Sequence, residues 1–325
     1  MKLNRIAIGL VVAAFSVIGT ARADYPDRAI NLIVPNPPGA TNDKLGRMLG
    51  QWLNKYLKQP VVIENRAGAA MAIGTQYVAN SPPDGYTLLL GGASAFVTNP
   101  LVRSDLRYNF HRDFKTVALI AKSPMIFLAN PSSSFKSMQD VVQTAEKHPG
   151  EVMYATAGSG SSLNIATEGL AADAGIRLEH IPYQGSAPAM LAVVKGEVPL
   201  MTEVVSGAVA YIKSGQVRGL GVGSAQRLPL LPNVPTVEEA TGIKNFRAGT
   251  WWSLTVPHAT PQPVIEKLRH VVDKILVDPS FQAIFQNDGL TIAAPMSLAQ
   301  TQDYMDSEVK RWATLYKTVE SRLAK

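Results

Sequence analysis

Cysteine is absent from the 325-residue sequence. This absence excludes disulfides, thiol nucleophiles and a lipid-bearing N-terminal cysteine. The sequence also lacks a Gly-x-Ser-x-Gly nucleophile motif, and its five histidines show no His-Glu-x-x-His zinc spacing. Because these signals of hydrolase and metal chemistry are missing, we predict no catalytic residues, no metal site and no cofactor.

Long hydrophobic runs are also scarce. The clearest one, residues 6–18, follows Lys2 and Arg5 and precedes Ala21-Arg22-Ala23. A basic start, a short apolar run and small residues at the end are typical of a secretory signal peptide, and the run is shorter than the roughly 20 residues that span a bilayer. We therefore predict that residues 1–23 are removed near Ala23 and that the mature chain is exported to a bacterial periplasm.

Runs of lysine and arginine are missing as well. The full sequence has 31 basic and 25 acidic residues, and Lys2, Arg5 and Arg22 lie in the predicted signal peptide. The remaining 302 residues therefore carry 28 basic residues, for a net charge of +3. This balance argues against a nucleic-acid partner. The length suffices for one large or two medium domains with cores of their own.

Short apolar runs alternate with helical patterns along most of the chain. This alternation predicts an α/β protein with largely parallel sheets. The predicted strands are 30–34, 61–64, 86–90, 117–121, 125–129, 152–155, 179–181, 200–203, 220–223 and 251–256. The clearest predicted helices are 137–147, 162–174, 186–195, 261–277 with Thr260 as its cap, and a long helix from Ser297 onward.

The loop Asn36-Pro37-Pro38-Gly39-Ala40 joins the first predicted strand to an amphipathic helix. Apolar residues recur every three or four positions from Leu45 to Leu57, and Thr41 or Asn42 is predicted to cap the helix. Backbone N–H groups at a helix start carry a partial positive charge and attract carboxylates or phosphates. The loop is therefore a candidate anion site, although a plain strand-to-helix turn would also use Pro and Gly.

A second loop, Ala157-Gly158-Ser159-Gly160-Ser161-Ser162, also follows a strand and opens a helix. Its glycines permit close backbone approach, and its three hydroxyls offer hydrogen-bond donors. The third glycine of a dinucleotide-binding fingerprint is missing. The two loops are about 120 residues apart, and ligands of open α/β sheets bind at the carboxyl ends of strands. The loops are therefore predicted to face each other across a cleft, with a simple turn again as the alternative.

Polar residues at other strand ends extend the candidate site. Glu203 ends an apolar strand and could meet an amine or hydroxyl of a ligand, or else be a solvated terminus. Gln184 ends another strand as a neutral donor and acceptor. Trp251 and Trp252 are adjacent, so their side chains face opposite sides of a strand, which predicts one in the core and one facing the cleft.

In order and spacing, these segments resemble the extracytoplasmic solute receptors of the tripartite tricarboxylate transporter family, also called Bug receptors. The resemblance covers nearly the whole mature chain and rests on many short segments together. They are Tyr25-Pro26-Asp27-Arg28, Val34-Pro35 through Asp43, Arg47, Val61-Val62-Ile63-Glu64-Asn65-Arg66, Ile73-Gly74, Pro83-Asp84-Gly85-Tyr86-Thr87-Leu88-Leu89, Asn99-Pro100, Asp113-Phe114, Gly158 to Ser161, His180-Ile181-Pro182-Tyr183, Leu231-Pro232-Asn233-Val234-Pro235-Thr236 and Arg311-Trp312.

The resemblance implies a type II periplasmic binding-protein fold, an α/β architecture of two lobes with a ligand cleft between them. It places residues 24–125 and 250–325 in the first lobe and residues 126–249 in the second. In this family the two facing loops hold a ligand carboxylate, partly through ordered waters, and a hinge motion closes the lobes on the ligand. The expected partners are a small carboxylate and the membrane permease subunits of a tripartite tricarboxylate-type transporter, and a monomer is expected.

Several residues depart from the family pattern near the expected ligand. Fewer of them are cationic than is usual in the family, which argues against a tricarboxylate and favours a mono- or dicarboxylate, with amino acids and aromatic acids included. The departures are Asn36 for an aromatic, Ala40 for a glycine, Ala67-Gly68-Ala69-Ala70-Met71 for Pro-Gly-Ala-Gly-Gly, Asn164 for a histidine, Gln184 for a basic residue and Pro199 for an aspartate.

The leading hypothesis is a receptor without enzymatic activity that delivers an organic acid to a permease. A receptor that signals to a membrane sensor kinase needs the same closing cleft, and a secreted α/β enzyme using Glu203 and the serines of the second loop is a further alternative. The candidate ligand-binding residues are Asn36, Pro38, Gly39, Ala40, Thr41, Asn42, Asp43, Ser94, Gly158, Ser159, Gly160, Ser161, Asn164, Gln184 and Glu203, with Trp252 as the weakest addition.

Overall fold

The structure is a computed structural model that describes residues 25–285 and 287–323, so the predicted signal peptide lies outside the described residues. In this part of the chain, ten strands form one sheet in the order β2-β1-β3-β9-β4-β7-β5-β6, and β8 and β10 also pair with β4. The strands are β1 Ile30–Val34, β2 Val61–Asn65, β3 Thr87–Gly92, β4 Phe114–Ala129, β5 Met153–Thr156, β6 Glu179–Pro182, β7 Leu200–Val204, β8 Arg218–Val222, β9 Gly249–Pro257 and β10 Thr291–Ile292.

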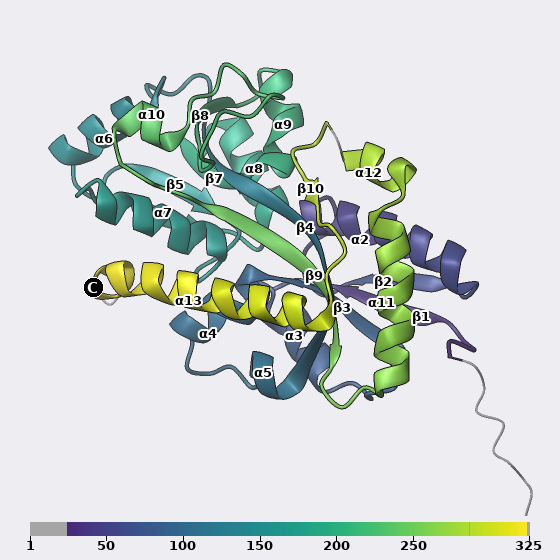
Figure 1. The fold of residues 1–325 in the computed structure, drawn as a ribbon. Coiled ribbons are helices and arrows are strands. Elements are labelled where there is room, and N and C mark those ends of the chain that lie inside the picture. The colour runs from purple at the N-terminus through teal and green to yellow at the C-terminus, as the bar shows by residue number, and fades with distance from the viewer. Residues whose placement is uncertain (1–24, 286, 324–325) are drawn as a thin grey trace, which may run out of the picture.

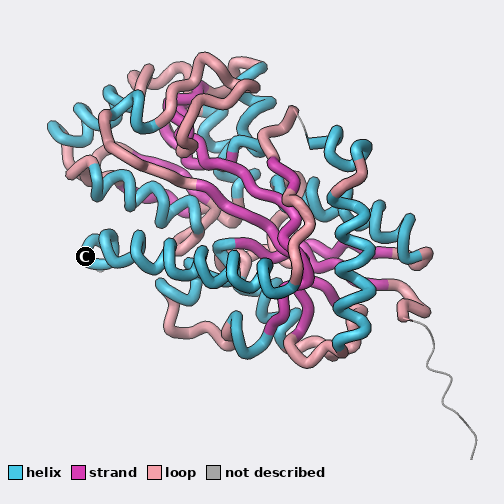
Figure 2. The backbone as a smooth tube through the Cα atoms, viewed as in Figure 1, coloured by secondary structure: helices cyan, strands magenta, loops and turns pink. Residues whose placement is uncertain are grey.

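Helices pack around this sheet at both of its ends (Figure 1 and Figure 2). A single π-helical turn, η1 Ser94–Thr98, follows β3. The α-helices are α2 Thr41–Leu57, α3 Ala72–Ala79, α4 Asn99–Val102, α5 Phe110–Asp113, α6 Met138–Lys147, α7 Ser162–Asp173, α8 Ser186–Lys195, α9 Val205–Lys213, α10 Val237–Thr241, α11 Gln262–Leu276, α12 Pro279–Phe285 and α13 Leu298–Leu323.

The sheet is parallel at its two ends and antiparallel at its centre. Strand β1 pairs in parallel with β2 and β3, and β5 pairs in parallel with β6 and β7. Strand β4 runs antiparallel to β7, β8 and β9, and β9 runs antiparallel to β3. The prediction of largely parallel sheets is therefore correct for the end strands and wrong for the centre, where two long strands cross between the halves of the molecule.

Strand β4 corrects a second prediction. The sequence predicts separate strands over 117–121 and 125–129, because Lys122, Ser123 and Pro124 interrupt the apolar run. The two segments form one strand, in which Pro124 stands opposite Gly249 and pairing passes from β9 to β7 and β8 at Met125. Lys122 is accommodated because its ammonium lies 4.0 Å from the centroid of the Tyr304 ring. Residues 114–129 therefore form one continuous strand.

Helix α2 shows how the sequence pattern becomes packing. Leu45, Leu49 and Leu53 are fully buried, as the spacing predicts. The predicted side-chain caps are wrong, because Ala40 is the N-cap residue and makes no side-chain cap bond. The Asn42 amide instead donates to Asn36 Oδ1 and to the carbonyl of Leu90, so the helix start is fixed by the loop and by strand β3.

Smaller shifts occur at other helix starts. At α11 the N-cap is Pro261 and the helix begins at Gln262, one residue later than predicted, while Thr260 Oγ1 is buried and has no partner in the described structure. At α6 the predicted start is confirmed to within one residue, because Ser137 is the N-cap and forms a capping box with Asp140.

The C-terminal helix α13 packs against both the long central strands and helix α7. Trp251 on β9 donates its indole N–H to Glu308 at 2.9 Å, and Arg311 makes two hydrogen bonds to the same carboxylate. Leu315 packs so closely on α7 that a Cβ at Gly169 would lie 2.6 Å from its Cδ1. In Figure 1, α13 runs alongside α7. The helix therefore holds α7 close to the central strands.

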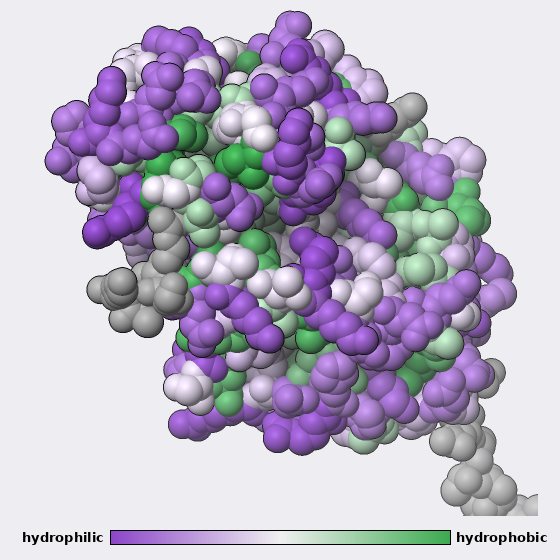
Figure 3. All heavy atoms as spheres, turned by 60° about the vertical axis from the view of Figure 1, so that its left-hand side comes forward, coloured by the Kyte–Doolittle hydropathy of each residue, from purple (hydrophilic) through white to green (hydrophobic). Residues whose placement is uncertain are grey.

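None of the described helices is long and apolar enough to cross a bilayer. The face in Figure 3 is mostly hydrophilic, and its hydrophobic residues are scattered in small groups. Single exposed apolar side chains of this kind are ordinary on globular proteins.

We expect Trp312→Ala to destabilise the protein by about 3–5 kcal/mol, because the Trp312 side chain on α13 is fully buried and its removal leaves a large cavity. Denaturant unfolding of the mature protein measures the change. The exposed substitution Lys310→Ala on the same helix serves as the control and should change the free energy of unfolding by less than about 0.5 kcal/mol. Equal effects of the two substitutions would contradict this role of α13.

Candidate functional site

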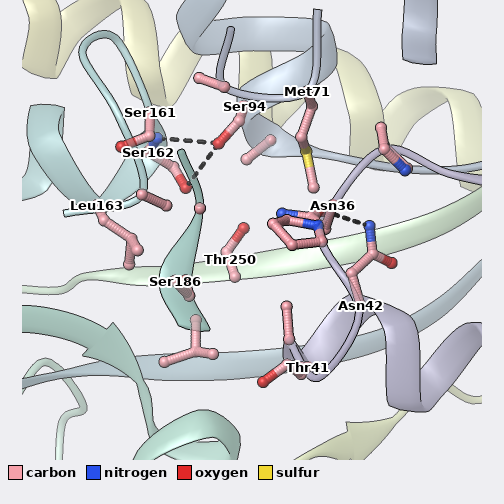
Figure 4. Close-up of a pocket in the computed structure, with 18 of the residues that line it drawn as sticks. Asn36, Thr41, Asn42, Met71, Ser94, Ser161, Ser162, Leu163, Ser186 and Thr250 are labelled. Carbon is pink, nitrogen blue, oxygen red and sulfur yellow. Dashed lines mark hydrogen bonds between the residues drawn. The ribbon is translucent and has the colours of Figure 1, made fainter. Parts of the chain in front are cut away.

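A pocket lies at the carboxyl ends of strands β1, β5, β6 and β7, where helices α2, α7, α8 and α9 begin (Figure 4). Its empty volume is about 680 Å³, a figure that includes space open to solvent. It is lined by Pro35, Asn36, Pro37, Ala40, Thr41, Asn42, Gly68, Ala69, Ala70, Met71, Ala93, Ser94, Ala157, Ser161, Ser162, Leu163, Gln184, Gly185, Ser186, Glu203, Val204, Thr250 and Trp252.

The start of α2 forms one wall. The amide N–H groups of Thr41, Asn42 and Asp43 have no hydrogen-bond partner among the described residues, as is usual in the first turn of a helix. These donors and the helix dipole make the wall attractive to an anion.

Asp43 fixes the loop before α2 and does not line the pocket. Its carboxylate accepts hydrogen bonds from the Gly39 amide at 3.0 Å, Asn65 Nδ2 at 2.9 Å and Arg47 Nε at 3.0 Å. Burial alone would raise the pKa of Asp43, but the bonds from Arg47, Gly39 and Asn65 outweigh it and hold the pKa below its ordinary value. The residue therefore shapes the loop as a carboxylate.

The start of α7 forms the opposite wall. Ser161 is the N-cap, and its hydroxyl accepts the Asn164 amide at 3.2 Å. The Ser162 amide donates to Ser94 Oγ at 3.0 Å, and the Ser94 hydroxyl donates to Ser162 Oγ at 3.3 Å (Figure 4). The Leu163 amide N–H has no partner in the described structure. A second free helix-start donor therefore reaches this pocket.

Contacts across the pocket show a closed arrangement. Ser94 follows β3 and bonds to Ser162, as described above. Ser206 Oγ donates to Thr41 Oγ1 at 3.3 Å, and Thr98 Oγ1 donates to the Gly160 carbonyl at 2.7 Å. A Cβ atom at Gly185 would lie only 2.6 Å from Pro37 Cγ. The backbone at position 185 therefore lies so close to the Pro37 ring that only glycine fits there. The two sides meet directly around the pocket.

Glu203 is buried in the pocket wall with one oxygen unsatisfied. Its Oε1 accepts the Val204 amide at 2.8 Å, and its Oε2 is buried with no hydrogen-bond partner in the described part of the chain. Burial raises the pKa of Glu203 to about 7, against the smaller lowering effects of the nearby Ser186 hydroxyl and the Val204 amide. Glu203 is also the one ionisable side chain among the described residues that line this pocket.

The segment 69–71 closes the pocket in an unusual backbone conformation. Ala69, Ala70 and Met71 have φ angles of 47°, 49° and 79°, in the left-handed region that favours glycine. The Asn99 side chain holds this turn by donating to the Ala70 carbonyl at 2.7 Å. Met71 points into the pocket in Figure 4. The side chains that replace the Gly-Gly of the family pattern at Ala70 and Met71 therefore line the pocket, on a backbone with three successive positive φ angles.

The structure divides the predicted ligand-binding residues into three groups. Eight line the pocket: Asn36, Ala40, Thr41, Asn42, Ser94, Ser161, Gln184 and Glu203. Gly158, Ser159, Gly160 and Asn164 border an adjacent hollow that also includes Gln184, Arg103 and His180. Pro38, Gly39 and Asp43 lie in the first loop but line neither space.

Other pocket residues were missed by the sequence reasoning. Ser186 and Thr250 reach the pocket from the start of α8 and from β9. These residues belong to no recognised sequence motif. Ser186 does follow a glycine, Gly185, at a strand end, as the helix starts after the two predicted loops do. The prediction for the paired tryptophans is confirmed, because Trp252 lines the pocket while Trp251 is buried against Glu308.

The neighbouring hollow contains the basic residues that the pocket lacks. Arg103 and His180 border it, but burial lowers the pKa of His180 to about 4, so this imidazole is neutral at physiological pH. The described residues contain no group of three or more His, Cys, Asp or Glu side chains that could hold a metal ion.

Two α/β lobes linked by crossing strands, with a small-molecule pocket where helix starts from both lobes meet, define the class of two-lobed binding proteins. The model of the tripartite tricarboxylate transporter family receptor matches residues 45–320, and the chain belongs to this family. The predicted family and the predicted two-lobed α/β fold are both confirmed.

Relatives of known name or structure support this assignment. The chain is 32% identical to the protein BugT of Bordetella pertussis, over 99% of this chain and 100% of BugT. A solved structure of an R. palustris protein with adipate has a TM-score of 0.87 and 30% identity, over 91% of this chain and 99% of that one. MatC from Rhodopseudomonas palustris with bound malate has a TM-score of 0.85 and 28% identity, over 90% and 99% of the two chains.

We expect the stability of the unliganded protein to fall as pH rises from about 4.5 to about 7. The pKa of Glu203 is about 7 in the folded protein and near 4.5 when unfolded, so in this range the unfolded state loses a proton that the folded state keeps. The loss should be on the order of 3 kcal/mol and level off above pH 7.

The variant Glu203→Gln isolates this contribution, since glutamine does not titrate. Denaturant unfolding at pH 5 and pH 8 should show the variant gaining stability relative to the wild-type protein at the higher pH. Parallel pH profiles of the two proteins would show that Glu203 ionises freely and would contradict its burial as an unpaired carboxyl group.

Proposed function

We propose that this protein is a periplasmic receptor that closes its two lobes around a small organic acid and presents it to the permease subunits of a tripartite tricarboxylate-type transporter. Residues 24–125 with 250–325 form the first lobe in this proposal, and residues 126–249 form the second. The ligand is released unchanged, so the protein acts without catalysis.

The observation that carries the proposal is the pair of helix starts at one pocket. Free amides of the pocket residues Thr41 and Asn42 lie on one side, and the free amide of Leu163 lies on the other. A carboxylate between them can accept hydrogen bonds from both lobes at once, which favours the closed form. Asn36 and Ser161 lie close to these donors and complete the polar surroundings.

The ligand class follows from the charges of the pocket and from the family. The solved relatives contain adipate in one case and malate in another, and both compounds are dicarboxylates. In this chain no Arg or Lys is among the described residues that line the pocket, and Glu203 adds a potential negative charge. A mono- or dicarboxylate, including amino acids and aromatic acids, suits such a site better than a tricarboxylate.

Membership of the family supports a role in transport. Two alternative functions, signalling and catalysis, predict different experimental results. A receptor for a sensor kinase would co-purify with a kinase ectodomain instead of permease subunits. A secreted enzyme would convert the acid during incubation, whereas a receptor returns it with unchanged mass.

The direct test is a thermal-shift screen of the mature protein, unfolded and refolded to remove co-purified ligand, against mono-, di- and tricarboxylates, amino acids and aromatic acids. A ligand at 100 times its Kd stabilises the folded state by about 2.7 kcal/mol. For a protein of this size, a rise in Tm of several degrees is expected with small acids. A shift with citrate alone, or with none of the acids, would contradict the proposed ligand class.

The variant Thr41→Pro tests the helix-start donors. Thr41 is the first residue of α2, a position where proline is tolerated, so the substitution removes one free N–H and keeps the helix. Loss of a hydrogen bond to a charged group costs about 1.5–3 kcal/mol, so the affinity for the best acid should fall at least about tenfold in calorimetry.

The control is Thr41→Ala, which removes the hydroxyl but keeps the amide N–H. Its affinity should stay within about threefold of the wild-type value. Equal losses in the two variants would assign the effect to the side chain and contradict the role of the amide.

A further inference from the structure

Glu203 has a buried oxygen that the folded chain leaves without a partner. The side chain is 2% exposed, and its Oε1 accepts the Val204 amide. Oε2 is buried without a hydrogen bond of good geometry from the described residues, although the Ser186 hydroxyl is close enough to lower the pKa of Glu203. A buried acceptor without a donor costs free energy, so such groups in native proteins call for an explanation. Because this residue lines the pocket, a bound ligand is a natural source of the missing donor.

The charges around the pocket select the kind of donor. None of the described residues that line it is cationic, and no charged neighbour contributes to the shift in the pKa of Glu203. A second ligand carboxylate would therefore meet an unpaired acid, whereas an ammonium group would neutralise it. A ligand with one carboxylate and one ammonium group leaves the closed pocket with balanced charges.

The position of Glu203 limits how far apart the two ligand groups can be. Ser206 follows it by three residues and donates to Thr41 at the start of α2. The carboxylate-binding wall and the β7–α9 junction that holds Glu203 are thus in direct contact on one side of the pocket. An ammonium group close to its carboxylate, as in an α-amino acid, matches this arrangement.

We propose that Glu203 is the subsite for a ligand amine and that the preferred ligands are small α-amino acids whose carboxylate meets the starts of α2 and α7. This inference rests on the proposed function, because it assumes that the pocket holds a carboxylate. It goes further by assigning the specificity of this chain to one residue.

Matched ligand pairs test the assignment. The refolded mature protein is titrated by calorimetry at pH 8 with four amino acids and with the acids that lack only the amine: L-aspartate and succinate, L-glutamate and glutarate, L-leucine and 4-methylpentanoate, L-phenylalanine and 3-phenylpropionate. In at least one pair we expect the amino acid to bind at least ten times more tightly than its partner.

The same pairs are then measured with Glu203→Gln and with the control Glu197→Gln, an exposed residue that does not line the pocket. The preference for the amine should fall at least tenfold in the first variant and remain in the second. Should the Glu203→Gln variant fail to refold, the wild-type pairs alone decide, because equal or reversed affinities overturn the proposal.

The outcomes separate this inference from the function on which it rests. If the acids without an amine bind as tightly as the amino acids, the amine subsite is wrong and the carboxylate receptor stands. If the variant keeps the full amine preference, another group recognises the amine and Glu203 is not the subsite. If no compound in the panel binds, both the inference and the proposed ligand class are overturned.

Discussion

The antiparallel pairing of β4 with β9 is the constraint on which the rest of the structure depends. These two strands carry the chain between the lobes, and their ladder runs from Phe114 to Pro124 on one strand and from Gly249 to Pro257 on the other. At Met125 strand β4 leaves β9 and pairs with β7 and β8. The change of partners places the carboxyl ends of strands from both lobes around one pocket.

This geometry explains how a pocket with few charged residues can select an anion. The recognition surface consists of backbone amides at helix starts, and those amides are positioned by buried side chains such as Asp43 and Ser94. Each of these side chains accepts a backbone amide, from Gly39 in the case of Asp43 and from Ser162 in the case of Ser94. The pocket therefore gains polarity without arginine or lysine, and Glu203 becomes the residue whose charge decides what fits beside the carboxylate.

Local patterns in the sequence predict the parts of this site that local physics determines. The loops before α2 and α7 follow apolar strands, so their carboxyl-end location and their helix-start donors could be anticipated. Ser186 and Thr250 could not be anticipated, because they reach the pocket only through the tertiary arrangement. The caps assigned to Thr41 and Asn42 failed because Asn42 finds better partners in Asn36 and the Leu90 carbonyl. The break expected at Pro124 failed because sheet pairing tolerates a proline where the partner strand changes.

A crystal structure of the refolded protein with its tightest-binding acid tests the central claim most directly. We expect the carboxylate oxygens to lie within hydrogen-bond distance of the free amides at Thr41–Asp43 and at Leu163, with both lobes closed on the ligand. A ligand bound in the neighbouring hollow beside Arg103 and His180, or one whose carboxylate points away from both helix starts, would contradict the account.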